Sequence, residues 1–167
     1  MVWGFKRYMI RFINQTKELA LKMNEWLNND DVKKYAMFDY TFDMELEYYQ
    51  NLKVDSNSDV NKADLFAVMD DTNLVGYIVL VYYKVNDKTE FTINPIVVNP
   101  KYQNMGYGKK IIKYVIDNYT HNIQAIECLI DIDNVFSEKL IKSFGFKMIK
   151  EENTFRTYRL LATACCL

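Results

Sequence analysis

The sequence predicts one α/β domain spanning residues 1–167, with about four helices flanking a mixed sheet of about six or seven strands. Half of the 167 residues are hydrophobic and 26% are charged, which is the balance of a globular domain. Alternating segments rich in β-branched and aromatic residues predict an antiparallel meander in the middle of the chain. A strand, a helix and another strand follow it, which predicts a βαβ crossover.

The first third of the chain predicts a strand and several helices. Residues 8–13 alternate like a strand, and Asn14 or Thr16 is a candidate N-cap for the helix that follows. Residues 31–38 fit either a short helical turn or an ordered loop, and residues 43–52 predict a further helix. Residues 55–64 are polar and predict an exposed linker within the domain. The apolar face of the first helix is expected to contain Leu19, Leu21, Met23, Trp26 and Leu27.

The periodicity of strands begins at residue 65. It gives three strands before the helix of the crossover and three after it. Asp-rich and Asn-rich turns at residues 70–73 and 86–87 separate the segments. The expected strands are residues 65–69, 74–83, 88–98, 125–132, 147–151 and 154–161.

One junction between a strand and a helix organises the chain. A β-branched strand ends before Pro100, which cannot donate a hydrogen bond to a sheet. A short loop follows, and apolar residues at helical spacing then begin at Ile111. The loop contains Gly106 and Gly108, which have no Cβ and allow a ligand to approach the backbone. The glycines therefore lie where a strand passes into a helix.

This junction has the chemistry of an anion site. The first turn of a helix offers unpaired N–H groups and the positive end of the helix dipole. Lys109 and Lys110 oppose that dipole unless an anion lies beside them. A phosphate-bearing ligand explains both lysines, although an ordinary turn with solvated lysines remains open. The known GxGxxG and GxxxxGK[ST] phosphate loops do not match.

A second segment follows the expected crossover strand. Asn134 is a natural N-cap, and Gly145 suits the left-handed residue that closes a helix. Phe136, Leu140 and Phe144 are expected to share the buried face of the helix between them.

These two segments together resemble the GNAT superfamily of N-acetyltransferases. Gln103-x-x-Gly106-x-Gly108, after an apolar strand, looks like the family's acyl-CoA signature. The segment from Asn134 to Phe146 is similar to the family's Asn-x-x-Ala/Ser-x-x-Leu-Tyr-x-x-x-Gly-Phe motif. More loosely, Trp26-Leu27 and Val32 look like a segment of its ribosomal-protein and aminoglycoside branches. The resemblance implies the GNAT fold, acetyl-CoA as cofactor and transfer of an acetyl group to a primary amine.

The resemblance also implies which residues hold coenzyme A. Backbone groups of Ile96, Val97 and Val98 would pair with the pantetheine arm as an added strand does. Loop residues would hold the pyrophosphate: Gln103, Asn104, Met105, Gly106, Tyr107, Gly108 and Lys109. Asn134 would bond the arm near its thiol end, and it can cap the helix as well, because its side chain has both an acceptor and donors.

The catalytic groups of the family are not matched. The position of the family's tyrosine acid is Ile141, and Thr92, Asn94 and Leu129 stand where different branches have their basic glutamate. Glu90 lies one alternation step before Thr92 and is a candidate base acting through water, or simply an exposed carboxylate at a strand end. Tyr158 is a candidate acid among several tyrosines, and water with good positioning is a further possibility.

Composition excludes several other classes. A formal net charge of −1 provides no field for nucleic acid or an anionic membrane. No transmembrane-length apolar run or signal-peptide pattern occurs, so a cytoplasmic protein is expected. The three cysteines and the single His121 have no metal-ligand spacing, and no metal is expected.

Three questions stay open at this stage. The acceptor is a small-molecule amine, such as a polyamine or an aminoglycoside, or a protein N-terminus. Loss of the tyrosine acid leaves an acyl-CoA-binding module or sensor as the alternative to an enzyme. The apolar tail from Leu160 to Leu167 is compatible with a homodimer.

Overall fold

The computed structural model describes residues 10–36 and 60–162. Within these ranges the strands form one sheet in the order β1-β2-β3-β4-β5-β7-β6. The strands are β1 (Ile10–Asn14), β2 (Val60–Asp70), β3 (Asn73–Val85), β4 (Lys88–Val98), β5 (Ile123–Asp131), β6 (Lys147–Glu152) and β7 (Phe155–Leu161). Only β4 and β5 pair in parallel, and every other neighbouring pair is antiparallel. The predicted meander and the βαβ crossover are therefore confirmed.

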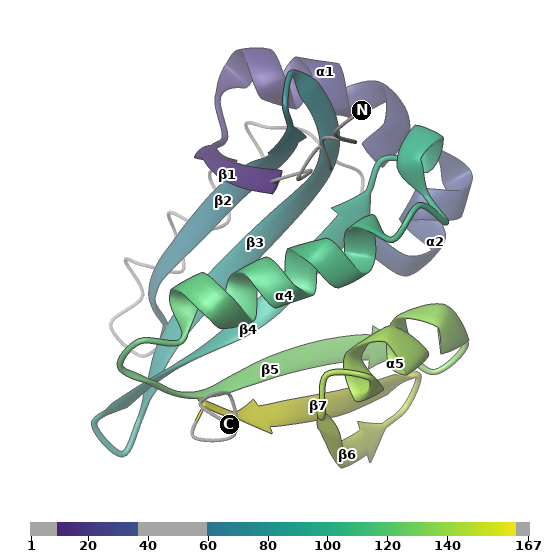
Figure 1. The fold of residues 1–167 in the computed structure, drawn as a ribbon. Coiled ribbons are helices and arrows are strands. Elements are labelled where there is room, and N and C mark those ends of the chain that lie inside the picture. The colour runs from purple at the N-terminus through teal and green to yellow at the C-terminus, as the bar shows by residue number, and fades with distance from the viewer. Residues whose placement is uncertain (1–9, 37–59, 163–167) are drawn as a thin grey trace, which may run out of the picture.

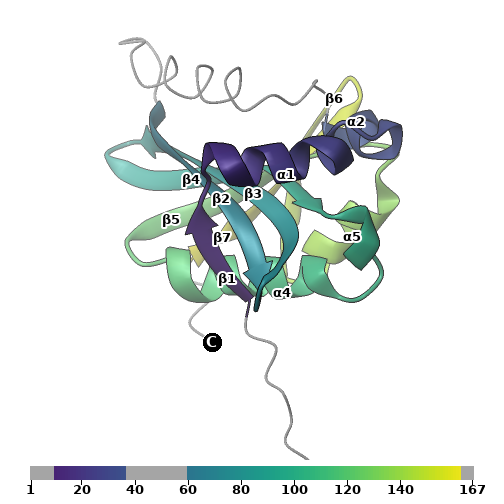
Figure 2. The same cartoon turned by 90° about the horizontal axis from the view of Figure 1, so that it is seen from above.

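Helices cover both faces of this sheet (Figures 1 and 2). On one face lies α1 (Lys17–Leu27), which leads into α2 (Asp30–Ala36). On the other face α4 (Tyr107–Tyr119) connects β4 to β5, and α5 (Val135–Lys142) follows β5. A 3₁₀ turn, η1 (Pro100–Tyr102), follows β4. The sequence allows either a helical turn or a loop at residues 31–38. The described part of this segment is helical through Ala36.

Each face has its own hydrophobic core. On the α4 side, Phe91, Ile111, Ile126 and other apolar side chains from β2 to β7 are buried in one cluster. On the α1 side a smaller cluster joins helix residues such as Met23 to Tyr77 and neighbouring positions of the sheet. Since successive residues of a strand point to opposite faces, each central strand contributes to both cores.

Local sequence signals account for most element boundaries. The Thr16 side chain accepts a hydrogen bond from the backbone N–H of Leu19 at 3.3 Å, which identifies Thr16 as the N-cap of α1. The two-residue turn between β3 and β4 has positive φ at Asn86 and Asp87 (47° and 64°). Asparagine and aspartate tolerate this conformation, whose twist suits a tight hairpin.

Three sequence expectations are wrong. The polar residues 60–64 are the start of β2 and not a linker, because pairing with β3 buries Ala63. Leu21 is 64% exposed, because α1 turns only its Ala20, Met23 and Leu27 face to the sheet. Phe136 is 82% exposed, because α5 buries Ile141 against the core instead.

Other expectations lie outside the described residues. They are the N-terminal part of the first strand, the helix at 43–52, residues 55–59 of the expected linker and the tail after residue 162. The homodimer stays a prediction.

We predict that Gly76→Ala destabilises the fold by about 1–3 kcal/mol. A Cβ atom at Gly76 would lie 2.8 Å from the carbonyl oxygen of Val97, which is backbone and cannot rotate away. Lys84→Ala, at an exposed position of the same strand, should change stability by less than about 0.5 kcal/mol. Urea unfolding of both variants measures the difference, and equal midpoints would contradict the packing of β3 against β4.

Candidate active site

The parallel strands β4 and β5 separate before they end. Their pairing runs to Ile93, which faces Cys128, and within residues 60–162 no further β4–β5 pair follows. Figure 1 shows the two strands diverging toward their carboxyl ends. The last residues of β4 still pair with β3 on their other side. One edge of the β4 end is therefore left without a strand partner, and we call this opening the β4–β5 fork.

A bulge in β4 coincides with the fork. Between their paired positions, β3 has Val79 alone, whereas β4 has Asn94 and Pro95. The extra residue bends β4, and Pro95 has no N–H to offer a neighbour. The fork therefore begins where the sequence prevents the ladder from continuing.

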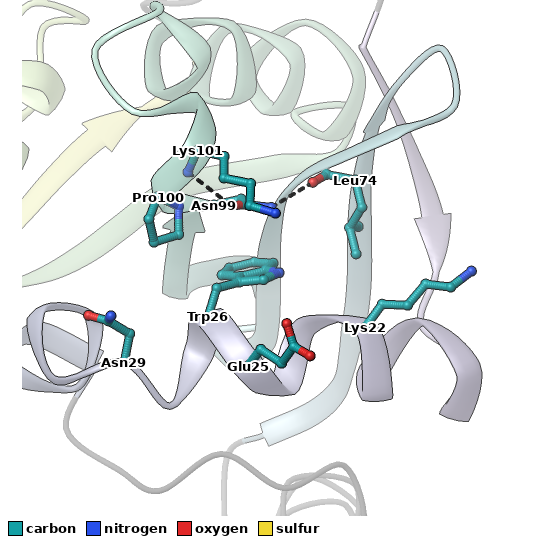
Figure 3. Close-up of a pocket in the computed structure, with 8 residues that line it drawn as sticks. All are labelled: Lys22, Glu25, Trp26, Asn29, Leu74, Asn99, Pro100 and Lys101. Atoms are coloured by element: carbon teal, nitrogen blue, oxygen red, sulfur yellow. Dashed lines mark hydrogen bonds between the residues drawn. The ribbon is translucent and has the colours of Figure 1, made fainter.

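The end of β4 is fixed to the start of β3. The buried Asn99 donates a hydrogen bond from its backbone N–H to Val75 at 2.9 Å and another from its side-chain amide to Leu74 at 3.1 Å. Its side-chain oxygen accepts a hydrogen bond from the N–H of Lys101 (Figure 3). These bonds set the direction in which the loop leaves the sheet.

The loop reaches α4 through two left-handed residues. Asn104 has φ 62°, and Gly106, the N-cap residue, has φ 81° and no side-chain cap. A Cβ atom at Gly106 would have no heavy atom within 4 Å, so this part of the loop faces open space. The first N–H groups of α4 have no carbonyl four residues earlier in the helix. The loop and the helix start together offer donors and positive potential to an anion.

The two loop glycines have different roles. A Cβ atom at Gly108 would lie 2.9 Å from the end of the Leu140 side chain, so its small size serves the packing of α4 against α5. The sequence predicts that a ligand approaches the backbone at both glycines. Open space supports this prediction at Gly106 only. Lys109 is exposed, and the ammonium of Lys110 lies 4.3 Å from the centre of the Tyr107 ring.

Tyr107 anchors the helix start to β2. Its hydroxyl donates a 2.6 Å hydrogen bond to the carboxylate of Asp70, and both side chains are buried. Its ring also meets Tyr102 edge to face. Tyr107 therefore holds the loop in place through its side chain, which sequence reasoning did not anticipate.

Asn134 lies at the far side of the fork, after β5. Its side-chain oxygen accepts a hydrogen bond from the N–H of Ser137 at 3.1 Å, which confirms it as the N-cap of α5. The cap uses the oxygen and leaves the amide NH₂ group to donate elsewhere.

Helices α1 and α2 lie over the α1 side of this region. The carboxylates of Asp133 and Asp131, after and at the end of β5, help raise the pKa of Lys34, although a hydrogen bond with Tyr35 is the larger cause. A cleft of about 310 Å³ separates α1 from the ends of β3 and β4 (Figure 3). Trp26 lines this cleft and also packs against the α1-side core.

Glu90 is fully buried, so the exposed strand-end carboxylate expected from sequence is wrong. Its Oε1 is ion-paired with Arg159 of β7, whereas its buried Oε2 has no hydrogen-bond partner within residues 10–36 and 60–162. Arg159 also donates a 2.6 Å hydrogen bond to Glu127 of β5. Sequence reasoning missed Glu127 and Arg159, because only the strand pairing brings them to Glu90.

Tyr158 is buried on the opposite face of the sheet. Its hydroxyl donates a 2.6 Å hydrogen bond to Glu138 of α5, which is also ion-paired with Lys142 and Arg156. Burial, and then this contact with Glu138, raises the pKa of Tyr158. The structure thus ties Tyr158 to α5, and the catalytic roles expected for Tyr158 and Glu90 stay predictions.

The described residues were compared with two further kinds of feature, a metal site and a membrane-spanning helix. In the described ranges, no group of three His, Cys, Asp or Glu side chains is placed to hold a metal ion. The helices within those ranges are too short or too polar to cross a membrane.

The family follows from a sequence comparison. A model of the "Acetyltransferase (GNAT) family" matches residues 22–146, which run from the second half of α1 through the fork and the loop to the end of α5. The chain belongs to the GNAT family of acetyltransferases. No curated protein matches its sequence.

Solved structures share this GNAT fold at low sequence identity. A spermidine N-acetyltransferase from Vibrio cholerae, in complex with CoA and spermine, is 18% identical with a TM-score of 0.75, covering 95% of this chain and 99% of that one. The Campylobacter jejuni N-acetyltransferase PseH, in complex with acetyl coenzyme A, is 16% identical with a TM-score of 0.64 (91% and 98% covered). An aminoglycoside N(6′)-acetyltransferase from Legionella pneumophila is 10% identical with a TM-score of 0.72 (98% of each chain covered).

The residues present fit acetyl-CoA, the cosubstrate of the family. Among the described residues, no strand pairs with the β5-facing edge of β4 at Ile96–Val98, where the Val98 carbonyl accepts a 3.4 Å hydrogen bond from the Gln103 side chain. Such an edge suits a chain with amide groups, which pairs with a strand edge as a peptide does. The open, left-handed loop at Gly106 and the start of α4 suit a pyrophosphate.

We predict that Tyr107→Phe destabilises the fold by about 1–3 kcal/mol, because it leaves the buried Asp70 carboxylate without its donor. Adding Asp70→Asn should recover part of this loss, since the neutral side chain is less costly to bury. Tyr102→Phe is the control, and chemical unfolding compares the variants. A loss equal to that of Tyr102→Phe would mean that the hydroxyl does not anchor the loop.

A second prediction concerns pH. Hydrogen bonds from Lys142 and then Tyr158 lower the pKa of Glu138 from 4.5 to about 2. A lowered pKa in the folded state stabilises the protein above pH 4.5, and this contribution is lost as the pH falls toward about 2. Glu138→Gln should therefore be less stable than the natural sequence at pH 6 and nearly equal to it near pH 2. Thermal melts across that range test this, and a constant difference would contradict it.

Proposed function

We propose that this protein transfers the acetyl group of acetyl-CoA to the primary amine of a small molecule, by direct attack in a ternary complex. The observation that carries the proposal is the β4–β5 fork, which lies between the Gly106 loop and Asn134. A donor held at the loop would extend along the free β4 edge toward the vertex of the fork at Ile93 and Cys128. The acceptor would then enter from the face covered by α1 and α2.

Backbone groups would do most of the work of holding the donor. In this proposal Ile96, Val97 and Val98 pair with its amide-bearing arm, and the loop of residues 103–109 holds its pyrophosphate. The side-chain NH₂ group of Asn134 donates to the arm from the other side of the fork. Bound there, acetyl-CoA supplies an activated thioester carbonyl.

The candidate side chains for proton transfer are buried or already paired. Ile141, in place of the family's tyrosine, is 2% exposed and packed in the core. The hydroxyl hydrogen of Tyr158 is already donated to Glu138, and Glu90 is paired with Arg159. We therefore propose that water removes the amine proton and protonates the thiolate, and that the protein accelerates the reaction mainly by positioning.

The buried Ile141 also favours one alternative, an acyl-CoA-binding module with little or no turnover. Release of free thiol that depends on an added amine separates the two functions. An enzyme releases thiol in proportion to the acceptor, whereas a binding module shows only ligand-dependent stabilisation.

The first experiment measures cofactor binding through the loop. Acetyl-CoA at a hundredfold excess over its Kd should stabilise the natural sequence by about 2.7 kcal/mol. Gly106→Asp should lose this effect, because it places a carboxylate at the open start of α4. Thermal midpoints with acetyl-CoA, coenzyme A and ATP make the comparison.

Gly145→Asp is the matched control. Gly145 is also exposed and left-handed (φ 86°), so its replacement adds the same charge and similar backbone strain. It lies after α5, away from the loop, and should keep the shift with acetyl-CoA. If neither CoA ligand shifts the natural sequence, or if both variants respond alike, the loop does not bind the donor.

A further inference from the structure

A polar cluster lies on the α1 side of the sheet beside the vertex of the fork. Glu127 of β5 is directly opposite Thr92 of β4 and Arg159 of β7, and Tyr83 of β3 is directly opposite Glu90. Residues opposite each other on adjacent strands share a face, as do residues two apart in one strand. These five residues therefore point to the same side, away from the α4-side core that holds Phe91, Ile93 and Cys128.

The cluster has more negative than positive charge. Among the described residues, Arg159 is the only cation that forms an ion pair with Glu90 or Glu127, so two carboxylates share one guanidinium. Burial raises the pKa of Tyr83, and the carboxylates of Glu127 and Glu90 contribute to this rise, which places its hydroxyl beside them as a neutral group. One negative charge is left over in a partly dry environment.

Two oxygens of this cluster are buried without a hydrogen-bond partner among the described residues, the hydroxyl of Tyr83 and Oε2 of Glu90. Glu90 is 0% exposed, and its Oε1 binds Arg159, whereas its Oε2 has no hydrogen-bond partner in the part of the chain that the structure describes. An unsatisfied buried carboxylate oxygen is costly, and the charge of a cation held nearby lowers that cost. Glu127 is the accessible member of the pair, because its side chain is 20% exposed.

Glu127 lies several ångströms from the position where the acceptor nitrogen would attack the thioester. On this face the first positions beyond the vertex are Asn94 on β4 and Leu129 on β5, and Glu127 lies two residues before Leu129. At about 3.3 Å per residue, a nitrogen attacking beside Leu129 is roughly 7 Å from Glu127. Attack requires the nitrogen to be about 3–3.5 Å from the carbonyl carbon, so Glu127 does not contact it directly. A second nitrogen of the same acceptor does reach Glu127.

We propose that the acceptor is a diamine or polyamine, and that Glu127, backed by Glu90 and fixed by Arg159, binds its distal ammonium while the proximal amine reacts. This inference rests on the proposed function and names its substrate class. An extended four-carbon diamine spans the distance of roughly 7 Å between a nitrogen beside Leu129 and Glu127. The carboxylate that is not balanced by Arg159 attracts the second ammonium of a diamine. A monoamine has no second ammonium, so the cluster favours the diamine.

The same three charges have a simpler role as a clamp that joins β4, β5 and β7. That role predicts no difference between amines with one charge and amines with two. Selectivity between a diamine and a monoamine of equal length therefore distinguishes the binding site from the clamp.

The experiment titrates amines into the protein saturated with coenzyme A, where no acetyl transfer occurs. The ligands are 1,4-diaminobutane and 1-aminobutane, and binding is measured by calorimetry. The natural sequence should bind the diamine at least tenfold more tightly, about 1.4 kcal/mol in binding free energy. In Glu127→Gln this preference should fall below about threefold, since the amide keeps an acceptor for Arg159 but removes the charge.

Two variants act as controls. Glu152→Gln removes an exposed carboxylate from β6, which is separated from β5 by β7, and should keep the preference. Glu127→Asp retains the charge and should keep part of it. Thermal melts without ligand establish that each variant is folded.

The outcomes separate this inference from the proposed function. If coenzyme A binds but the natural sequence shows no preference for the diamine, or if Glu127→Gln retains the preference, the cluster is only a clamp and the acceptor is another amine. If coenzyme A itself does not bind, the proposed function fails and this inference fails with it. Steady-state acetylation supplies an independent check, because Glu127→Gln should raise KM for the diamine at least tenfold and leave KM for the monoamine unchanged.

Discussion

The separation of β4 from β5 is the constraint on which the rest of the site depends. Parallel strands normally pair along their length, and here pairing stops at Ile93 and Cys128 because Asn94 and Pro95 bulge β4 away. Beyond this point the described residues provide no β-ladder on the β5 side of β4, and backbone groups without a ladder need a side chain, a ligand or water as partner. In the function that we propose, this break in the sheet is where acetyl-CoA binds.

Buried polar contacts hold the elements that surround this break. Tyr107 binds Asp70 and fixes the start of α4 to β2, and Tyr158 binds Glu138 and fixes α5 to β7. Each contact joins two elements on the α4 side, so neither end of the fork can shift alone. In these two pairs a tyrosine hydroxyl and a carboxylate join two elements and help to position the backbone. This arrangement agrees with a reaction that depends on placing its two substrates more than on a dedicated acid.

The sequence predicted the strands, the N-cap at Asn134 and the left-handed Gly145, because each rests on periodicity or on a local backbone requirement. It failed where neighbours distant in the chain decide the outcome. Polar residues at 60–64 became strand because β3 pairs with them. Helix α5 buries Ile141 and leaves Phe136 exposed, because its packing against the sheet decides which apolar residues are covered.

The sequence by itself determined the order of elements, the family resemblance and the position of the glycine loop between β4 and α4, since these depend on residues within a few positions of one another. Only the tertiary structure decided which charges meet. Arg159 is 69 residues from Glu90, and the register of β4, β5 and β7 places them together with Glu127. Electrostatic energy depends on distance in space, which a linear sequence does not contain. The charge that we assign to acceptor selection therefore became visible only in the folded sheet.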